Sequence, residues 1–482
     1  MIFPTFTFAC FFLVVFIGFW YVFRRSRDRT IFLIAASYLF YAFWDWRFCF
    51  LLFFSTAINY GFGWLIGTRK EHVWRKFYLV LAVLTNVLLL GFFKYYTILA
   101  THLNALFSWG SSLSGGQESI FSLPVIAVLL PVGISFFTFK ALSYVFDVYL
   151  CKISPVKSFP DIMLYISFFP QLASGPIVHA SDFLPQIEPA VTAGIEPGSR
   201  PISFDRAATL IVSGLIKKMV FANFISTLLV DPIFSNLSIF NTLEVIIAAV
   251  GYSAVIYADF SGYSDMAIGI ALLLGFETPE NFNRPYTSFS VTEFWKRWHI
   301  TFSSWLRNYL YFAFGGSRFG KKRTLFALIA TMIIGGLWHG ASIPFLIWGG
   351  MQGCVLALER AFNYGTKRSL EPWKAAVQIL TTFSFVTLSW VVFRSSNLQA
   401  LGLWFTSLKN FSIPLSISLP VPLFLIFLTI TTQFVPSYIR KRSMKCWITV
   451  PIPVKGIFLA AFFVILSIVS MSGIAPFIYF QF

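Results

Sequence analysis

Apolar runs long enough to cross a lipid bilayer recur along the whole chain, and they leave it few possible folds. A helix needs about 20 mostly apolar residues to span the hydrocarbon core, where every backbone polar group must be hydrogen-bonded within the protein. The chain has 57% hydrophobic and 11% charged residues, whereas soluble domains have roughly 45–50% and 25%. The short alternating segments typical of a membrane β-barrel are not seen. The sequence therefore predicts an all-α polytopic membrane protein.

The spacing of these runs predicts about 10–13 transmembrane helices, with re-entrant or interfacial helices among them, in one integral membrane unit covering residues 1–482. Several runs are too short or too interrupted to span simply, which indicates broken helices. A stretch rich in proline and acids, residues 180–201, predicts an extramembrane loop. The apolar segments lie near residues 6–23, 31–53, 55–67, 77–93, 124–150, 161–178, 207–230, 243–275, 325–347, 345–360, 375–393, 420–435 and 454–475.

The net charge of +17 comes from short basic clusters between the apolar runs. This arrangement is typical of cytoplasmic loops and predicts contact with anionic membrane lipids, not with nucleic acid. The five cysteines are scattered, so the sequence predicts neither a disulfide framework nor a thiolate metal site. No cluster of His, Asp or Glu has zinc-ligand spacing, and we expect no bound metal.

His339 is the most unusual polar residue in an apolar context. It lies in the stretch Gly335-Gly336-Leu337-Trp338-His339-Gly340, and the chain has only five histidines. A histidine at membrane depth costs free energy unless it is paired or lines a cavity, which favours a functional role. Imidazole also titrates near neutrality, so it suits general-base catalysis. The alternative is a packing histidine at a helix end.

A second histidine, His299, lies in an aromatic and basic tract over residues 293–309. Aromatic residues recur there at helical spacing, which predicts one continuous amphipathic helix. On that helix His299 would share a face with Trp295, Phe302 and Leu306. It could serve chemistry or sit at the level of the lipid headgroups.

Two carboxylates, Asp259 and Asp265, are embedded between apolar runs. They could form a proton or substrate site. Because buried charges are normally paired, an ion pair with Arg284, Arg297 or Arg307 is the favoured alternative.

Several ordered strings of polar, aromatic and glycine residues run through the chain. They are Leu130-Pro131-Val132-Gly133-Ile134-Ser135-Phe136-Phe137-Thr138-Phe139, Phe169-Pro170-Gln171, Ser174-Gly175-Pro176-Ile177, Gly214-Leu215-Ile216-Lys217-Lys218, Asp259–Asp265, Pro279-Glu280-Asn281-Phe282-Asn283-Arg284-Pro285-Tyr286, Glu293–His299 and Gly335–Gly340. Together these strings resemble the membrane-bound O-acyltransferase family, most closely its bacterial branch that serves alginate O-acetylation. The resemblance covers nearly the whole chain and is densest over residues 130–355.

The resemblance implies a membrane-embedded funnel in which an acyl group passes from a thioester donor to a hydroxyl, with no bound cofactor. His339 matches the family's essential histidine and His299 its second characteristic one, so both are predicted to be catalytic. Where the family usually has Asp after Trp-Leu-Arg, this chain has Asn308, and no carboxylate role is assigned there. The predicted substrate-binding residues are Trp338, Asp259, Asp265, Asn283, Trp298 and Arg307.

The resemblance further implies a multi-pass protein of the bacterial inner membrane that acetylates an exported, alginate-like polysaccharide. The expected donor is a cytoplasmic acyl thioester such as acetyl-CoA. Loops of about 20 residues are too short for a soluble domain, which needs roughly 50 or more, so we expect a separate periplasmic acetyltransferase as partner. Peptidoglycan O-acetylation and D-alanyl transfer to teichoic acid remain alternatives, the latter with a carrier-protein thioester. From other classes, a solute channel or transporter and a scaffold for polymer export remain.

Overall fold

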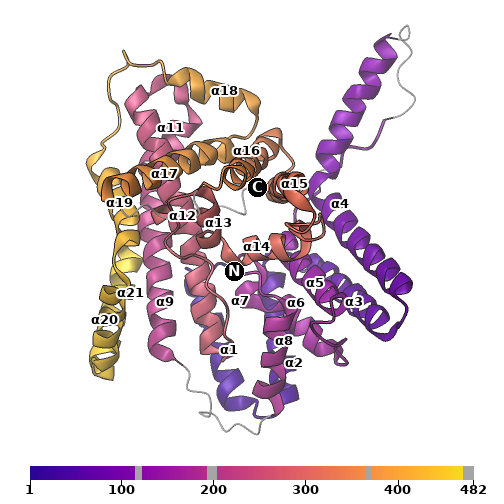
Figure 1. The fold of residues 1–482 in the computed structure, drawn as a ribbon. Helices are drawn as coiled ribbons and strands as arrows, with labels where there is room; N and C mark the ends of the chain where they lie inside the picture. The colour runs from indigo at the N-terminus through magenta and orange to yellow at the C-terminus, as the bar shows by residue number, and fades with distance from the viewer. Residues whose placement is uncertain (114–121, 127, 193–202, 365–370, 470–482) are drawn as a thin grey trace. The chain divides into compact units, whose positions relative to one another are not determined.

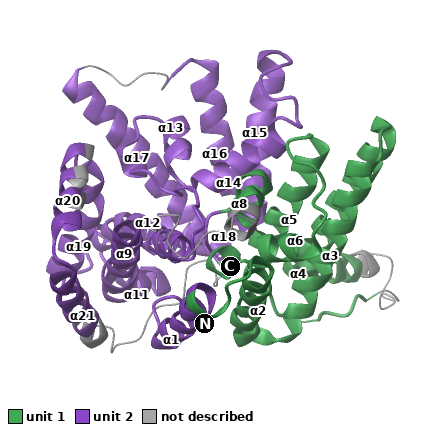
Figure 2. Cartoon of the chain, turned by 90° about the horizontal axis from the view of Figure 1, so that it is seen from below, with its two compact units in different colours: residues 1, 21–173, 177–194 green, residues 2–20, 174–176, 195–482 purple. Residues whose placement is uncertain are grey.

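The computed structural model describes residues 1–113, 122–126, 128–192, 203–364 and 371–469. Over these residues the chain forms α-helices with short π and 3-10 helical turns and no strand (Figure 1), which confirms the all-α prediction. The chain divides into two compact units (Figure 2). Unit 1 comprises residue 1, residues 21–173 and residues 177–194, and unit 2 comprises residues 2–20, 174–176 and 195–482. The single integral unit expected from sequence stays a prediction.

Unit 1 holds seven α-helices within its described residues, among which α3 packs against α4 and α5, and α2 packs against α6. The loop predicted over residues 180–201 is wrong in its first part, because residues 180–192 form a helix. Phe183, Leu184 and Ile187 recur there at helical spacing and are buried, which favours a helix over an exposed loop. Residues 193–201 lie outside the described residues. The helices are α2 (Ser26–Asp45), α3 (Arg47–Thr68), α4 (His72–Leu113), α5 (Ile134–Tyr149), α6 (Phe159–Ser167), α7 (Phe169–Leu172) and α8 (Ala180–Thr192).

Unit 2 carries the remaining α-helices, and π-helical turns over residues 216–222, 226–230 and 306–311 continue some of them. These helices are α1 (Phe6–Ile17), α9 (Phe204–Leu215), α10 (Asn223–Ile225), α11 (Asp231–Ser235), α12 (Thr242–Leu273), α13 (Val291–Arg297), α14 (Ile300–Trp305), α15 (Gly320–His339), α16 (Ile343–Ala361), α17 (Pro372–Arg394), α18 (Leu398–Ser407), α19 (Pro420–Thr431), α20 (Ser437–Thr449) and α21 (Ile452–Val469).

Five helical segments of the described chain are long and apolar enough to cross a membrane by length and composition. They cover residues 47–68, 72–109, 204–235, 242–273 and 372–394, and three shorter apolar helices accompany them. The protein is therefore a multi-pass membrane protein, as the sequence predicted. The count of 10–13 spans stays a prediction.

The long helix α12 is the buried element of unit 2. Its start is fixed by a capping box, in which the Asn241 side chain accepts a backbone N–H and Glu244 accepts the N–H of Asn241. Along its length α12 packs against α9 (Figure 1), where Ala207 meets Ile268 and Leu272 in an apolar cluster. This helix thereby holds Asp259, Phe260 and Ser264 inside the protein.

Helices α15 and α16 approach closely because glycines lie at their contact. A Cβ on Gly336 would collide with the carbonyl oxygen of Phe345, and one on Gly353 would lie 2.8 Å from the Cα of Ile329. Small residues at such positions let two helix backbones pack together. The close packing fixes the end of α15, and His339 is its last residue.

Candidate active site

His339 lies in an aromatic enclosure built from four helices. It is 5% exposed. Its imidazole centroid lies 4.8 Å from the ring of Trp338, 5.2 Å from Trp348 on α16, 5.1 Å from Phe393 on α17 and 5.5 Å from Phe302 on α14. Such an enclosure shields the imidazole from water. Trp338 packs against His339, and its predicted role in binding substrate stays a prediction.

His299 lies at a break between two short helices, not within one helix as predicted. Its backbone is left-handed, with φ of 42°, between the end of α13 and the start of α14. The break is stabilised by the turn that precedes α13, because the carbonyl oxygen of Asn281 accepts the N–H of Ile300 at 2.9 Å and Arg297 O accepts the N–H of Asn283 at 2.9 Å. Aromatic periodicity did not reveal this break, since its hydrogen-bond partners are distant in sequence.

The imidazole of His299 is 1% exposed and is held by one polar neighbour. Its Nδ1 lies 3.0 Å from Oδ1 of Asn281, and the ring of Phe260 packs edge-on at 4.6 Å between centroids. Burial lowers the pKa of His299 to about 3. The side chain is therefore neutral at physiological pH.

A single side chain, Phe302, joins the two histidines. Its ring centroid lies 5.0 Å from that of His299 and 5.5 Å from that of His339. It also lies 4.6 Å from the ring of Trp338, whose centroid is 6.5 Å from that of His299. The structure thus brings together His299, His339 and Trp338, which are separated by up to 40 residues in sequence.

Asn283 is exposed and has no described contact with this cluster, and its predicted role in binding substrate stays a prediction. The residue that contacts His299 is Asn281, two positions earlier and 1% exposed. Both asparagines stand in one string, and no local pattern separates them. Only the fold around residues 281–283 decides which side chain points inward.

The two carboxylates of α12 are paired, but with lysines and not with the arginines expected from sequence. Asp259 lies 2.6 Å from Nζ of Lys218, and both side chains are at most 5% exposed. Asp265 lies 2.6 Å from Nζ of Lys217, with side chains 19% and 23% exposed. The helix packing of α12 against residues 216–222 creates these pairs. The pairs account for the carboxylates structurally, and a substrate role for either stays a prediction.

Trp298 belongs to a neighbouring aromatic cluster. Its ring lies 4.9 Å from Trp390, 5.0 Å from Phe282 and 5.5 Å from Phe294. This cluster packs α13 against α17. The described contacts give Trp298 a packing role, and its predicted role in binding substrate stays untested.

Arg307 is exposed and lines a cavity of about 680 Å³ next to the histidine cluster. Leu306 and Met332 also line it, and Leu306 lies 3.1 Å from the Cβ position of Gly335, which Phe302 also approaches. Two more basic residues, Lys296 and Arg360, share the lining with hydroxyl side chains such as Ser303, Ser304 and Thr331. Within the described chain none of these three basic side chains forms an ion pair. This cavity suits an anionic ligand.

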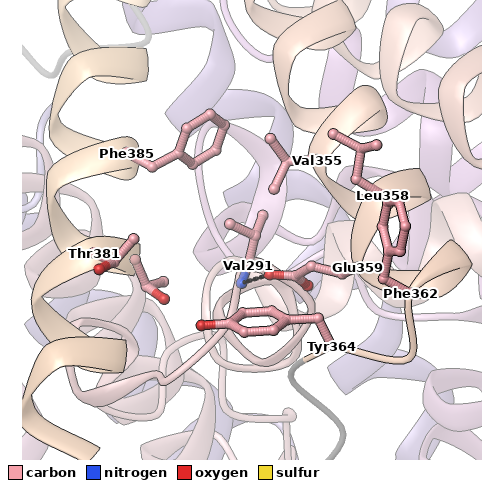
Figure 3. Close-up of a pocket in the computed structure, with 9 residues that line it drawn as sticks. Val291, Val355, Leu358, Glu359, Phe362, Tyr364, Thr381 and Phe385 are labelled. Atoms are coloured by element: carbon pink, nitrogen blue, oxygen red, sulfur yellow. Dashed lines mark hydrogen bonds between the residues drawn. The ribbon is translucent and has the colours of Figure 1, made fainter. Parts of the chain in front are cut away.

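The side chain of Glu359 caps the start of α13. Its two carboxylate oxygens accept the backbone N–H groups of Val291 at 2.7 Å and Thr292 at 2.8 Å. Figure 3 shows this carboxylate beside Val291 at the base of a second, largely apolar pocket of about 440 Å³. Negative charge at a helix N-terminus is favourable. No sequence pattern points to Glu359, because only the fold brings residue 359 to residue 291.

Within the described residues, no group of three or more His, Cys, Asp or Glu side chains is placed to hold a metal ion. The cluster itself offers two imidazoles, which can carry out acid–base chemistry, in surroundings made of aromatic rings.

Comparison with known protein families gives a match over residues 132–395 to the model of MBOAT, the membrane-bound O-acyltransferase family. The chain belongs to this family. The match includes His299, His339, Asn281 and Phe302. The protein is thus an acyltransferase, which confirms the resemblance seen in its sequence motifs and disfavours the channel, transporter and scaffold alternatives.

The proteins to which the chain is similar carry three different names. The chain is 37% identical over 417 residues to the probable alginate O-acetylase AlgI of Pseudomonas syringae pv. tomato, covering 85% of this chain and 76% of the relative. It is 33% identical over 427 residues to the peptidoglycan O-acetyltransferase of Helicobacter pylori, covering 82% and 77%. It is 26% identical over 282 residues to the teichoic acid D-alanyltransferase of Bacillus subtilis, covering 54% and 68%.

Proposed function

We propose that this membrane-bound O-acyltransferase moves an acetyl group from a cytoplasmic thioester donor across the bacterial inner membrane, for O-acetylation of an exported polysaccharide of the alginate type. The observation that carries the proposal is the pair of buried histidines packed on Phe302 in a family whose members transfer acyl groups. The identity to proteins named alginate O-acetylase supports the polysaccharide acceptor.

The reaction needs one base and one site for developing negative charge. A neutral imidazole accepts the proton of the acceptor hydroxyl while its oxygen attacks the thioester carbonyl. The tetrahedral intermediate then collapses as the C–S bond breaks, and the imidazolium returns the proton to the departing thiolate. The net result is an ester and a free thiol. Buried surroundings strengthen each electrostatic interaction in this sequence.

The cavity lined by Lys296, Arg307 and Arg360 supports an anionic donor. Acetyl-CoA carries phosphate groups, which guanidinium and ammonium groups bind through charge-assisted hydrogen bonds. We place the donor there, with its thioester directed toward the histidines. Basic clusters such as Lys321-Lys322-Arg323 fit a cytoplasmic face in contact with anionic lipid. The final transfer would be made by a periplasmic acetyltransferase partner.

The test compares cells that carry no copy, the wild type or His339→Ala, with equal protein amounts checked by blot. Base-labile acetate is measured on secreted polysaccharide and on peptidoglycan. We expect the wild type, and not the variant, to restore acetate to the secreted polysaccharide. Full restoration by His339→Ala would remove the catalytic role of this residue.

Peptidoglycan is a second candidate acceptor, because the relative in Helicobacter pylori is named for it. Acetate restored to the peptidoglycan fraction alone would favour this candidate. Ester-linked D-alanine in place of acetate would instead favour the third group of relatives.

A further inference from the structure

The side chain of Asn281 forms a network of hydrogen bonds at the break between α13 and α14. Its Oδ1 faces three groups, namely Nδ1 of His299 at 3.0 Å, Oγ1 of Thr301 at 2.9 Å and the backbone N–H of Thr301 at 3.3 Å. Its Nδ2 donates to Oγ of Ser264 on α12 at 3.1 Å. These four side chains are at most 3% exposed.

The orientation of the Asn281 amide follows from one of these partners. A backbone N–H can only donate a hydrogen bond, so the amide atom that faces Thr301 N must be the oxygen. The opposite orientation would set the amide NH2 against that N–H and would leave two donors facing one another in a buried place. Oδ1 is therefore the atom that His299 contacts.

The tautomer of His299 follows in turn. An amide oxygen only accepts, so Nδ1 of His299 must carry the hydrogen that it donates to Asn281. In a neutral imidazole the other ring nitrogen then has a lone pair and no hydrogen. That nitrogen, Nε2, is buried and has no hydrogen-bond partner among the described residues.

We propose that Asn281 is a positioning residue that fixes this tautomer, so that His299 receives the proton of the acceptor hydroxyl at Nε2 and does not donate a hydrogen bond to the oxyanion. The proposal rests on the proposed acyl transfer and assigns a direction of proton movement within it. The proton moves from the hydroxyl oxygen to Nε2 as the C–O bond forms, and it leaves with the thiolate of the donor.

The surroundings support this direction. Burial keeps His299 neutral, so the lone pair is available throughout the physiological pH range. The rings of Phe302 and Phe260 hold the imidazole plane, and Asn281 fixes its rotation. A hydroxyl that donates to Nε2 would satisfy a buried acceptor whose lack of a partner costs free energy. Stabilisation of the oxyanion would then fall to other donors of the cluster.

The first experiment reads the tautomer without any need for activity. The full-length protein is reconstituted in liposomes with ring-15N histidine, and solid-state 15N NMR is recorded at pH 7.5 and pH 5. The chain has five histidines, and loss of one signal pair in His299→Gln assigns His299. If that variant does not fold, Asn281→Asp provides the assignment, because its carboxylate shifts His299 alone. We expect protonated Nδ1 and bare Nε2 at both pH values. Protonated Nε2 with bare Nδ1 would overturn the proposal.

The second experiment measures free thiol released from acetyl-CoA by permeabilised cells that carry the protein together with its envelope partners, with alginate oligosaccharides added and cells without the protein as the blank. Asn281→Leu should lower kcat about 100-fold with little change in the KM for acetyl-CoA, since only proton transfer is impaired. Asn281→Asp should restore much of the rate, with the acidic limb of the pH profile moved to higher pH, because a carboxylate stabilises the imidazolium. Equal loss in both variants with an unchanged pH profile would contradict a positioning role.

Asn236→Ala is the control, because Asn236 is exposed and its side-chain oxygen accepts the hydroxyl of Ser238 at 2.8 Å. It should keep the wild-type rate and pH profile. If the wild type itself releases no thiol, the proposed donor or acceptor is wrong, whereas the NMR result still decides the tautomer. The failures of the two proposals are therefore distinguishable.

Discussion

The ring of Phe302 is stacked on the imidazole of His299, with 5.0 Å between the ring centroids and 22° between the planes. The same ring lies 5.5 Å from the imidazole of His339. One apolar side chain on α14 thus positions both histidines, one from a helix break and one from a helix end. This arrangement links the packing of the aromatic cluster directly to its chemistry.

Replacing Phe302 should therefore impair activity more than an ordinary core substitution does. Phe302→Ala removes a wholly buried ring and should destabilise the protein by about 3–5 kcal/mol. At temperatures where the variant stays folded, we expect at least about a 100-fold lower rate, because small displacements of catalytic groups cost this much. Phe137→Ala, which removes an equally buried ring from α5 in unit 1, is the comparison variant. Similar rates in the two variants would refute the positioning role of Phe302.

Breaking the buried ion pair of Lys218 and Asp259 should strongly destabilise the protein. Either Lys218→Met or Asp259→Leu leaves an uncompensated charge away from water, which costs about 3–5 kcal/mol. The double variant removes both charges and should recover most of that loss. Thermal unfolding in detergent measures the effect.

The neighbouring pair of Lys217 and Asp265 supplies the control. Its side chains are partly exposed, so Asp265→Asn should cost only about 1 kcal/mol. If the folded Lys218→Met/Asp259→Leu variant also loses all activity, Asp259 has a chemical role in addition to its structural one.

The stability of the protein should depend on pH through His299. Its pKa is lowered to about 3 in the folded protein, whereas an unfolded histidine has a pKa near 6.5. The unfolded state therefore binds more protons between these values, and the free energy of unfolding falls as the pH decreases through this window. From pH 7 to pH 5 the loss is about 2 kcal/mol.

Thermal unfolding of the wild type and His299→Gln at pH 7 and pH 5 tests this dependence. The wild type should lose more stability on acidification than the variant, because all other titrating groups are common to both. Equal losses would mean that the imidazole of His299 is accessible to protons in the folded state.

Glu359→Gln should weaken the start of α13. One of the two carboxylate oxygens becomes an amide nitrogen, which cannot accept the N–H of Val291 or Thr292. We expect a loss of about 1–3 kcal/mol in stability and a lower rate, because α13 leads into His299. Glu371→Gln, whose carboxylate is paired with Lys374 at the surface, should change stability by less than about 1 kcal/mol. A stable, fully active Glu359→Gln would show that the cap does not support the active site.

Arg307→Gln should raise the KM for acetyl-CoA about 10-fold with a smaller change in kcat, since it removes one charge that we place on the phosphates. The effect should shrink as salt concentration rises, because ions screen exposed charges. Steady-state kinetics at two salt concentrations provide the measurement. Lys322→Gln, exposed and outside the cavity lining, is the control and should leave KM unchanged.

The sequence by itself determined the class of fold and the family. Long apolar runs predict membrane helices because lipid tolerates few other backbone conformations. The ordered strings around His299 and His339 predicted an acyltransferase, and the family match confirms that prediction.

Tertiary structure alone decided how the candidate site is built. The break at His299, the choice of Asn281 over Asn283, and the cap from Glu359 all depend on hydrogen bonds between residues 14 to 68 positions apart. The lysine partners of Asp259 and Asp265 likewise follow from helix packing, whereas the sequence suggested Arg284, Arg297 or Arg307. The periodicity of apolar residues along the chain indicates which residues are shielded from lipid or from water. It carries no information on which polar group satisfies another across the fold, because that depends on the packing of distant segments.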